Sequence, residues 1–235
     1  MPTATYSQRR GEIETYFDRT AAETWKRLTS DAPVSGIRAT VRAGRDRMRV
    51  TLLDWLPADL DGMRLLDAGC GTGALAIAAA ARGADVVAID IAPTLIAIAK
   101  ERAEASPAPA RGRVDFLTGD MLSPSLGSFD AVVGMDSLIH YTAPDMLSMV
   151  SRLAERCTGR VLFTFAPRTP ALAVMHAVGR YFPRSDRAPA IEPVDQNELR
   201  SLIVREPALS HWSIGRTERI VSGFYTSQAL ELIRK

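Results

Sequence analysis

An α/β fold with a mainly parallel sheet is the architecture that this sequence predicts. From Gly62 onward, short apolar runs alternate with helical patterns, as expected for consecutive strand–helix units. A glycine-rich turn separates the first apolar run from the first of these helices. The chain has 235 residues, of which 46% are hydrophobic and 24% charged, enough for one compact domain with a short appendage and too few for two ordinary domains. We therefore expect one domain.

Seven strands are expected between Gly62 and the C-terminus. Five parallel strands are predicted at Arg64 to Ala68, Asp85 to Asp90, Arg113 to Thr118, Phe129 to Met135 and Arg160 to Ala166. Helices are predicted at Thr72 to Ala81, Pro93 to Ala105 and Pro144 to Arg156. The segments HWSIGRTERI and FYTSQALELI, separated by Val221-Ser222-Gly223, predict a hairpin. Its second strand is expected to be antiparallel and to lie at the edge of the sheet.

The first sixty residues predict two helices, and we expect residues 1–60 to form an arm or lid over the domain at 61–235. The first helix carries aromatic and apolar residues that suit core or lid packing: Ile13, Tyr16, Phe17 and Trp25. The second has an apolar stripe, which should pack against the sheet: Val34, Ile37, Val41, Met48, Leu52 and Trp55. A basic stripe lies beside it: Arg38, Arg42, Arg45 and Arg49. A solvated face is the favoured interpretation for Arg38 and Arg49, although a row of guanidinium groups also suits an anionic ligand.

The segment 167–206 is expected to be a substrate-recognition insertion in this domain. It is rich in proline and arginine, with a helix predicted near Leu172 to Tyr181 and then a loop. Long irregular insertions in compact domains often carry substrate specificity.

Composition excludes several classes of function. Lys+Arg 29 against Asp+Glu 27 leave a formal net charge of only +2, so nothing predicts sequence-independent binding to nucleic acid or acidic lipid. No apolar run approaches the roughly 18 residues of a membrane span, and the start MPTATYSQRRGE lacks the apolar core of a signal peptide. The two cysteines, Cys70 and Cys157, suit a reducing compartment. We expect a cytoplasmic protein without a transmembrane segment or a nucleic-acid partner.

The segment LLDAGCGTGALAIAAA predicts a ligand site. It consists of a strand ending in Asp67, the loop Gly69-Cys70-Gly71-Thr72-Gly73 and an alanine-rich helix. Glycines let the backbone turn sharply and approach a ligand, and the N–H groups at the start of a helix favour a negative group. The glycine pattern alone does not identify the ligand, because Gly69, Gly71 and Ala74 also satisfy the G-x-G-x-x-A pattern of dinucleotide enzymes.

Acidic residues at three successive strand ends help to identify the ligand. Asp67 precedes the first glycine, Asp90 ends the second strand, and Asp120 lies in the turn Thr118-Gly119-Asp120-Met121 after the third. For any one of them alone, a helix cap or turn residue is the simpler interpretation. Together they resemble the class I S-adenosylmethionine-dependent methyltransferases, which have a Rossmann-like fold. That resemblance assigns the first acid to the methionine part of the cofactor or its waters, the second to ribose, and the third with its neighbour to adenine.

The cofactor implied by this resemblance is S-adenosylmethionine, with S-adenosylhomocysteine as its product. No resident metal site is expected. The residues that should bind the cofactor are Asp67, Gly69, Cys70, Gly71, Gly73, Asp90, Ile91, Asp120, Met121 and Met135.

The fourth strand should bring acceptor-binding residues to the same edge of the sheet. Its sequence FDAVVGMDSLIHY ends in Asp136, Ser137, His140 and Tyr141, beside the expected position of the sulfonium group. A single histidine is more often a packing or hydrogen-bonding residue than a catalyst. His140 is nevertheless one of only 3 histidines and directly follows a strand expected to contact the cofactor, so it is the candidate catalytic residue.

Several segments resemble the magnesium-protoporphyrin IX methyltransferases of (bacterio)chlorophyll biosynthesis. They are YFDRTAAETWKRL, DAGCGTGALAI, MDSLIHY, FTFAPRTPAL, GRYFPRSDRAPA and GFYTSQALE, and they extend from the first helix to the C-terminus. The glycine loop is common to all class I enzymes, whereas the LIHY, APRT and FPRSDRAP segments are much more specific. Family members have a tyrosine shortly after the early tryptophan where this chain has Thr29, so no role of that tyrosine carries over.

This resemblance implies methyl transfer to one propionate of magnesium-protoporphyrin IX, giving the monomethyl ester. The residues then expected to bind the porphyrin are Tyr16, His140, Tyr141, Arg168 and Arg184. His140 would hydrogen-bond the reacting propionate or approach the magnesium as an axial ligand, and Arg168 or Arg184 would pair with the second propionate. Contact with magnesium chelatase and a peripheral position at the photosynthetic membrane are also implied.

Four alternative functions are considered at this point. A methyltransferase for another small acid or hydroxyl compound would have the same cofactor site and a different pocket. A nicotinamide-dependent oxidoreductase is disfavoured by Asp67 and by the Gly-Asp-Met turn at Gly119 to Met121. A tetrapyrrole carrier or regulator would bind S-adenosylhomocysteine without turnover. RNA methylation is disfavoured by the near-neutral charge and by the lack of an added basic domain.

Overall fold

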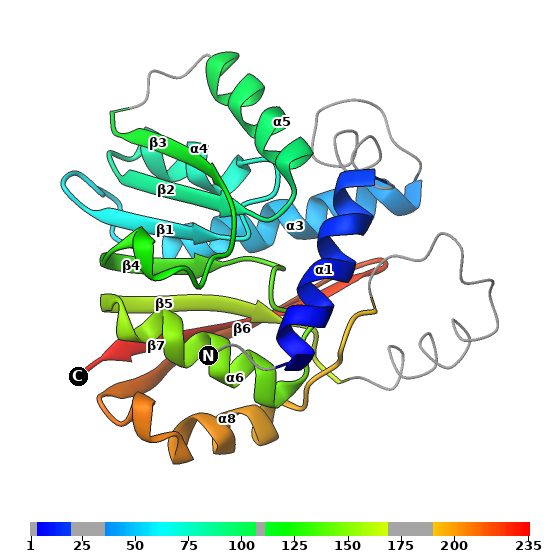
Figure 1. Cartoon of the computed structure of the whole chain (residues 1–235), viewed down its shortest axis with the longest axis vertical. Coiled ribbons are helices and arrows are strands. Elements are labelled where there is room, and N and C mark those ends of the chain that lie inside the picture. The colour runs from blue at the N-terminus through cyan, green and yellow to red at the C-terminus, as the bar shows by residue number, and fades with distance from the viewer. Residues whose placement is uncertain (1–3, 20–35, 107–110, 169–189) are drawn as a thin grey trace.

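A seven-stranded sheet in the order β3-β2-β1-β4-β5-β7-β6 crosses the molecule (Figure 1). The structure is a computed structural model, and it describes residues 4–19, 36–106, 111–168 and 190–235. The strands are β1 (Arg64–Ala68), β2 (Asp85–Asp90), β3 (Arg113–Thr118), β4 (Phe129–Gly134), β5 (Cys157–Phe165), β6 (Trp212–Ser222) and β7 (Tyr225–Arg234). The first five are parallel to one another, and β7 is antiparallel to β5 and β6. The predicted fold class, including the antiparallel last strand, is confirmed.

The predicted C-terminal hairpin forms, but its place in the sheet differs from the expectation. β7 lies between β5 and β6, so the expectation that the second strand of the hairpin forms the edge is wrong. The physical reason is burial: residues 227–232 of β7 are buried on both faces, whereas most of β6 is half-buried or exposed. A strand that is buried on both faces lies inside a sheet and not at its edge. The turn of the hairpin is Gly223-Phe224, because Val221 and Ser222, which were expected in the turn, belong to β6.

Six α-helices and two short 3₁₀ turns connect or precede these strands in the described part of the chain. They are α1 (Ala4–Arg19), α3 (Gly36–Asp54), α4 (Ala74–Ala81), α5 (Pro93–Glu104), η1 (Pro124–Leu126), α6 (Ala143–Glu155), α8 (Gln196–Arg205) and η2 (Pro207–Leu209). Helix α4 begins two residues later than predicted because Gly73 has a left-handed φ of 78° and precedes its first turn. The helix predicted near Leu172 to Tyr181 lies outside the described residues. None of the described helices is long and apolar enough to cross a membrane.

Alternating residues of the central strands build a hydrophobic core on each face of the sheet. Leu66, Val132 and Phe163 join α6, α8 and α1 on one face, and Leu65 and Val133 join α3 and α4 on the other. This period of two is expected for strands covered by helices on both sides. Helices α1 and α3 therefore lie on different faces of the sheet. Both reach the same end of it.

Helix α3 buries only part of its predicted apolar stripe. Met48, Leu52 and Trp55 are buried, whereas Ile37 near the first turn is 57% exposed; Val34 lies outside the described residues. The helix approaches β7 closely at Gly44, where an added Cβ atom would lie 2.4 Å from the ring of Tyr225.

Helix α1 crosses the side of the sheet at which the parallel strands end (Figure 1). Two of its apolar residues, Tyr6 and Ile13, belong to the core on the α6 side. Thr5 donates to Asp145 of α6 at 3.0 Å, and Arg9 pairs with Glu192 at 3.0 Å. These contacts dock α1 over the carboxyl ends of the strands.

Candidate active site

A cavity lies under α1 at the carboxyl ends of β1, β2 and β4. Its empty volume is about 1110 Å³, including the part open to solvent. In open α/β sheets, ligands bind outside the carboxyl ends of the strands, where the strand order reverses. Here that point lies between β1 and β4. The cavity therefore lies where the sequence predicts the ligand site.

Eight of the ten residues expected to bind the cofactor line this cavity. They are Asp67, Gly69, Cys70, Gly71, Asp90, Ile91, Met121 and Met135. Gly73 instead packs behind the loop, where its Cα faces the ring of Phe116. Asp120 lies beside the cavity, and its neighbours Gly119 and Met121 contribute to the lining.

The glycine loop is fastened to the end of β2 by backbone hydrogen bonds. The N–H groups of Gly69 and Cys70 both donate to the carbonyl of Ile89, at 2.8 and 3.0 Å. The N–H of Gly71 donates to Asp90 Oδ2 at 2.9 Å. Gly69 has a φ of 80°, and an added Cβ atom would lie 2.3 Å from Cβ of Ser137. Only glycine therefore fits at this position.

Two buried carboxylates face the cavity at the tips of β1 and β2. Asp67 is 1% exposed, and its Oδ2 has no hydrogen-bond partner in the described part of the chain. Burial, and then repulsion by Asp90, raise the pKa of Asp67 to about 7. Burial also raises the pKa of Asp90. Both carboxyl groups would be stabilised in the ionised form by a cationic or hydroxyl-rich ligand.

The third predicted acid, Asp120, is held by α1. Its carboxylate accepts hydrogen bonds from the Tyr6 hydroxyl at 2.7 Å and from the N–H of Leu122 at 2.8 Å, and it pairs with Arg10 at 2.9 Å. Burial, followed by the hydrogen bond to Asp120, raises the pKa of Tyr6, so this phenol stays protonated. The carboxylate of Asp120 therefore connects α1 to the turn that lines the cavity.

The end of β4 supplies the opposite wall. Met135, Asp136, Ser137, His140 and Tyr141 all line the cavity, so the structure brings the residues of this segment together there. His140 is 8% exposed, and its Nδ1 lies 3.1 Å from the carbonyl oxygen of Ala190. Tyr141 stacks on Tyr6 with 5.4 Å between the ring centroids.

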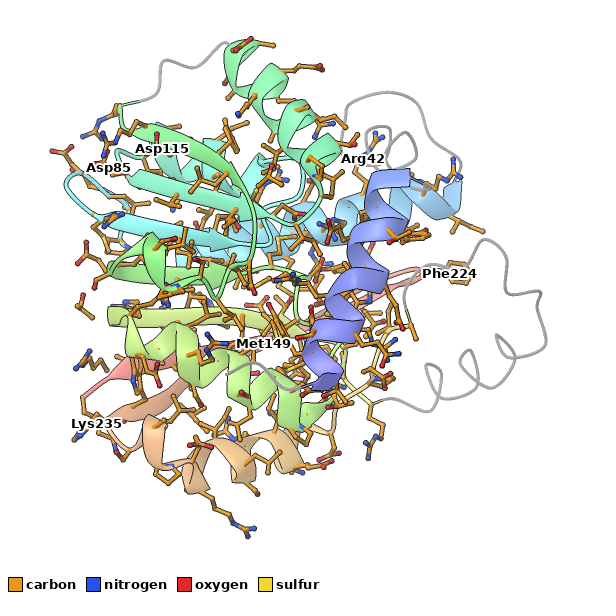
Figure 2. All side chains as sticks on the ribbon, in the orientation of Figure 1. Arg42, Asp85, Asp115, Met149, Phe224 and Lys235 are labelled. Atoms are coloured by element: carbon orange, nitrogen blue, oxygen red, sulfur yellow. The ribbon has the colours of Figure 1, made fainter. Side chains whose placement is uncertain are left out.

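The basic stripe of α3 faces the cavity more fully than predicted. Arg42, Arg45 and Arg49 line it, together with Asp46; Figure 2 shows Arg42 on the part of α3 near α1. Arg38 is exposed, as expected. Arg49, for which a solvated face was the favoured interpretation, lines the cavity with a side chain that is 28% exposed and pairs with Asp46 at 2.9 Å.

The remaining predicted porphyrin-binding residues lie elsewhere. Tyr16 is half-buried and packs edge-on against Phe17, with 5.2 Å between centroids, and Phe17 rather than Tyr16 lines the cavity. The Arg168 side chain is 59% exposed and lies 3.8 Å from Glu198. Arg184, Trp25 and Thr29 lie outside the described residues.

Sequence reasoning missed two residues of α1. Tyr6 and Arg10 line the cavity with Ile13 and Phe17. The spacing 6, 10, 13 and 17 is that of one helical face, and this periodicity was the signal that could have identified them.

Comparison with known proteins identifies the family. Residues 134–234 match the family model for the magnesium-protoporphyrin IX methyltransferase C-terminus, and residues 65–160 match a general methyltransferase domain. The chain is 46% identical to the magnesium-protoporphyrin O-methyltransferase of Rhodobacter capsulatus over 96% of this chain and 97% of that protein. The Synechocystis enzyme of the same name is 30% identical over 94% and 95% of the two chains.

A solved structure supports the same assignment. The crystal structure of magnesium protoporphyrin IX methyltransferase from Synechocystis PCC 6803 with bound S-adenosylhomocysteine matches with a TM-score of 0.83 and 30% identity, over 96% of this chain and 99% of that one. The cofactor of the present chain is accordingly S-adenosylmethionine. Its sequence, its sheet topology and the acids at its strand tips agree, and the chain belongs to the magnesium-protoporphyrin IX methyltransferases, a family of class I S-adenosylmethionine-dependent O-methyltransferases.

Proposed function

We propose that this protein transfers a methyl group from S-adenosylmethionine to one propionate of magnesium-protoporphyrin IX, in the biosynthesis of chlorophyll or bacteriochlorophyll. A propionate oxygen bonds to the methyl carbon while the carbon–sulfur bond breaks, giving the monomethyl ester and S-adenosylhomocysteine. The observation that carries the proposal is one cavity in which the glycine loop and paired acids face the His140 wall, in a chain 46% identical to a magnesium-protoporphyrin O-methyltransferase.

The residues at the strand tips fit the cofactor. Asp67 Oδ2, which has no hydrogen-bond partner among the described residues, suits an ammonium group or its water. Asp90 lies where ribose hydroxyls can donate to it. We assign adenine to the wall formed by Gly119 and Met121, with Asp120 beside it. When bound, the cofactor supplies an electrophilic methyl group on a positively charged sulfur.

Positioning is the main task of the protein in this reaction. A propionic acid with a pKa of about 4 is already ionised at neutral pH, so the acceptor needs no strong general base. The walls of the cavity would hold the carboxylate close to the methyl carbon and exclude water. We propose that α1, within the arm at residues 1–60, serves as the lid that closes over the reactants.

The hydrogen bond of His140 supports a specific role for this residue. A backbone carbonyl oxygen only accepts hydrogen bonds, so Nδ1 of His140 carries the proton that it shares with Ala190. The neutral ring then has its lone pair on Nε2. Metal-binding histidines commonly donate their other N–H to a backbone carbonyl in this way.

We therefore propose that Nε2 of His140 approaches the magnesium of the porphyrin as an axial ligand. Donation from Nε2 to the propionate, the alternative role, requires the doubly protonated ring. Tyr141 and Phe17, which line the cavity near His140, supply apolar surface for the macrocycle. Tyr16 would contribute only by supporting Phe17.

The segment 167–206 is proposed to recognise the second propionate through Arg168 or Arg184. The main chain at the start of this segment is fixed, because the N–H of Arg168 donates to the carbonyl of Val194 at 2.9 Å. An exposed pair 3.8 Å apart, such as Arg168 and Glu198, is weak and exchanges readily for another anion. Titrating Arg168→Ala and Arg184→Ala with magnesium-protoporphyrin and with its diester tests this role. Equal losses for both pigments would count against ion pairing.

Family membership also motivates two further proposals. The protein contacts magnesium chelatase, and it lies at the periphery of the photosynthetic membrane. Co-sedimentation with lipid vesicles and gel filtration with the chelatase subunits test them separately. Unchanged sedimentation and elution would reject both.

The function itself is tested by incubating the protein with magnesium-protoporphyrin and cofactor labelled in the methyl group. The expected product has the mass of the labelled monomethyl ester. Binding of S-adenosylhomocysteine and of pigment without product would identify a carrier, and the absence of any absorbance shift of the pigment would favour a different acceptor. Asp90→Ala, which should weaken cofactor binding by about 1 to 3 kcal/mol, is the negative control.

A further inference from the structure

A buried cluster of polar side chains surrounds Asp136 at the end of β4. The Asp136 side chain is 4% exposed. Its carboxylate accepts hydrogen bonds from the hydroxyl groups of Tyr225, Ser227 and Thr164, each at 3.0 Å. It also forms an ion pair with Arg45 of α3 at 2.7 Å. Three different elements thus converge on one carboxylate.

The backbone of Asp136 is constrained as well. Its N–H donates to the Thr164 hydroxyl at 2.7 Å, and its φ of 54° is the one left-handed value among the described non-glycine residues. A non-glycine residue in this region is strained and persists only where its surroundings hold it. Strain of this kind is concentrated at functional sites. The surroundings of Asp136 supply the necessary restraint through four side chains.

Helix α3 approaches this cluster because Gly44 permits it. An added Cβ atom at Gly44 would meet the Tyr225 ring, so a larger residue would separate the helix from β7. Arg45, the next residue, has a side chain that is only 19% exposed, and it lines the cavity beside Asp136. The close contact between α3 and β7 therefore brings a guanidinium group into the cavity wall.

A second buried ion cluster in this fold serves as a comparison, because it lies away from the cavity. Glu231 of β7 is 0% exposed and is bound by Arg160 and Arg216. None of these three residues lines the cavity. The cluster at Asp136 differs because both of its charged members do.

We propose that Asp136 is a positioning residue that holds Arg45 in the cavity wall, where Arg45 binds a carboxylate of one of the two reactants. The inference rests on the proposed function, which brings carboxylates from two sources: the methionine part of the cofactor and the propionates of the porphyrin. Guanidinium is suited to carboxylate because its N–H groups match the two oxygens. Both charged residues already lie within the lining, so no rearrangement of the fold is needed.

Paired ligands that differ only in the carboxylate test this role. S-adenosylhomocysteine is compared with its decarboxylated analogue, and magnesium-protoporphyrin with its dimethyl ester, by calorimetry and absorbance titration. Arg45→Gln is expected to weaken one carboxylate-bearing ligand by about 10- to 100-fold and to leave its counterpart nearly unchanged. The affected pair identifies the source of the carboxylate. Arg38→Gln, an exposed change on the same helix, is the matched control.

Asp136→Asn should give the same ligand-specific loss, because its effect passes through Arg45. The double variant should then bind no more weakly than Arg45→Gln alone. If Asp136→Asn does not fold, Ser227→Ala and Tyr225→Phe each remove one hydrogen bond to Asp136 and should give the same pattern, about 2- to 10-fold. Equal losses for a ligand and its counterpart, or no loss, would overturn the proposal. Binding and turnover by the unmodified protein would leave the proposed function intact in that case.

Discussion

The Tyr6 hydroxyl donates a 2.7 Å hydrogen bond to the Asp120 carboxylate, joining the first helix to the turn that follows β3. Arg10 binds the second oxygen of the same carboxylate at 2.9 Å. Gly119 and Met121, on either side of Asp120, line the cavity. The position of α1 and the shape of the proposed adenine wall are therefore coupled through one side chain.

Removing this hydrogen bond should loosen the bound cofactor. Tyr6→Phe deletes one hydrogen bond to a carboxylate that is otherwise unchanged, so the Kd of S-adenosylhomocysteine is expected to rise by about 3- to 10-fold. The increase should appear in the dissociation rate, measured by stopped-flow fluorescence, because α1 covers the site. Thr15→Val, which removes an exposed hydroxyl of the same helix, is the control. An unchanged dissociation rate for Tyr6→Phe would show that this contact does not retain the ligand.

Asp67 predicts a specific pH dependence of binding. Its pKa of about 7 in the ligand-free protein means that lowering the pH through 7 neutralises the group that faces the cofactor. The affinity of the unmodified protein for S-adenosylhomocysteine should fall as the pH is lowered from 8 to 6. Asp67→Asn should bind more weakly at pH 8 and show a flatter profile in calorimetric titrations. Asp115→Asn, at the opposite end of the sheet in Figure 2, should follow the unmodified protein.

The same group should affect stability in the opposite direction. The folded protein retains a proton on Asp67 that the unfolded chain, with an ordinary pKa of 3.8, has lost. The free energy of unfolding contributed by Asp67 therefore decreases as the pH rises from about 4 to about 7. Asp67→Asn is expected to be more stable than the unmodified protein at pH 8 by about 1 to 3 kcal/mol, measured by denaturant unfolding. Lower stability of the variant at pH 8 would contradict the raised pKa.

Much of this site could be predicted from local sequence. The boundaries of β1, β2 and β3 agree with the expectation because each apolar run is bounded by a turn signal. The convergence of Asp67 and Asp90 follows from parallel strands that end at one edge. These features depend only on the order of elements along the chain.

Features that depend on packing between distant segments could not be predicted. The sequence of a hairpin does not specify which of its strands pairs with β5, and burial places β7 there. The proximity of Arg45 and Asp136, 91 residues apart, depends on the contact of Gly44 with Tyr225. Tyr6 and Asp120, 114 residues apart, meet only because α1 folds back over the strand ends.

Gly69 offers a test of the loop geometry. Gly69→Ala places a Cβ atom 2.3 Å from Cβ of Ser137 and adds the strain of a φ of 80°. We expect a loss of about 2 to 4 kcal/mol in stability and a large loss of cofactor affinity. Gly62→Ala has similar strain, with a φ of 72°, but its Cβ atom meets no other atom within 4 Å. It should lose only about 1 kcal/mol in thermal unfolding and retain cofactor binding.

The role of His140 can be tested by comparing the affinity of the protein for magnesium-protoporphyrin and for the metal-free pigment. If Nε2 binds the magnesium, the unmodified protein prefers magnesium-protoporphyrin to the metal-free pigment. His140→Ala should reduce that preference by about 10-fold in fluorescence titrations. His211→Ala, an exposed histidine, is the control. Equal weakening for both pigments would instead indicate contact with a propionate, and the dimethyl ester would then be unaffected by the substitution.

Glu231 should be important for stability and not for ligand binding. Burial alone would raise its pKa, but hydrogen bonds from Arg216 and Arg160 lower it below the ordinary value of 4.5. Ionised Glu231 therefore stabilises the fold above about pH 4.5, and this contribution is lost as the pH falls below that value. Glu231→Gln should lower the free energy of unfolding at pH 7 by about 1 to 3 kcal/mol, whereas Glu218→Gln on the exposed part of β6 should change it little. The difference in the free energy of unfolding between Glu231→Gln and the unmodified protein should shrink in acid. Both proteins should bind S-adenosylhomocysteine equally well, because Glu231 lies outside the cavity wall to which Asp136 and Arg45 belong.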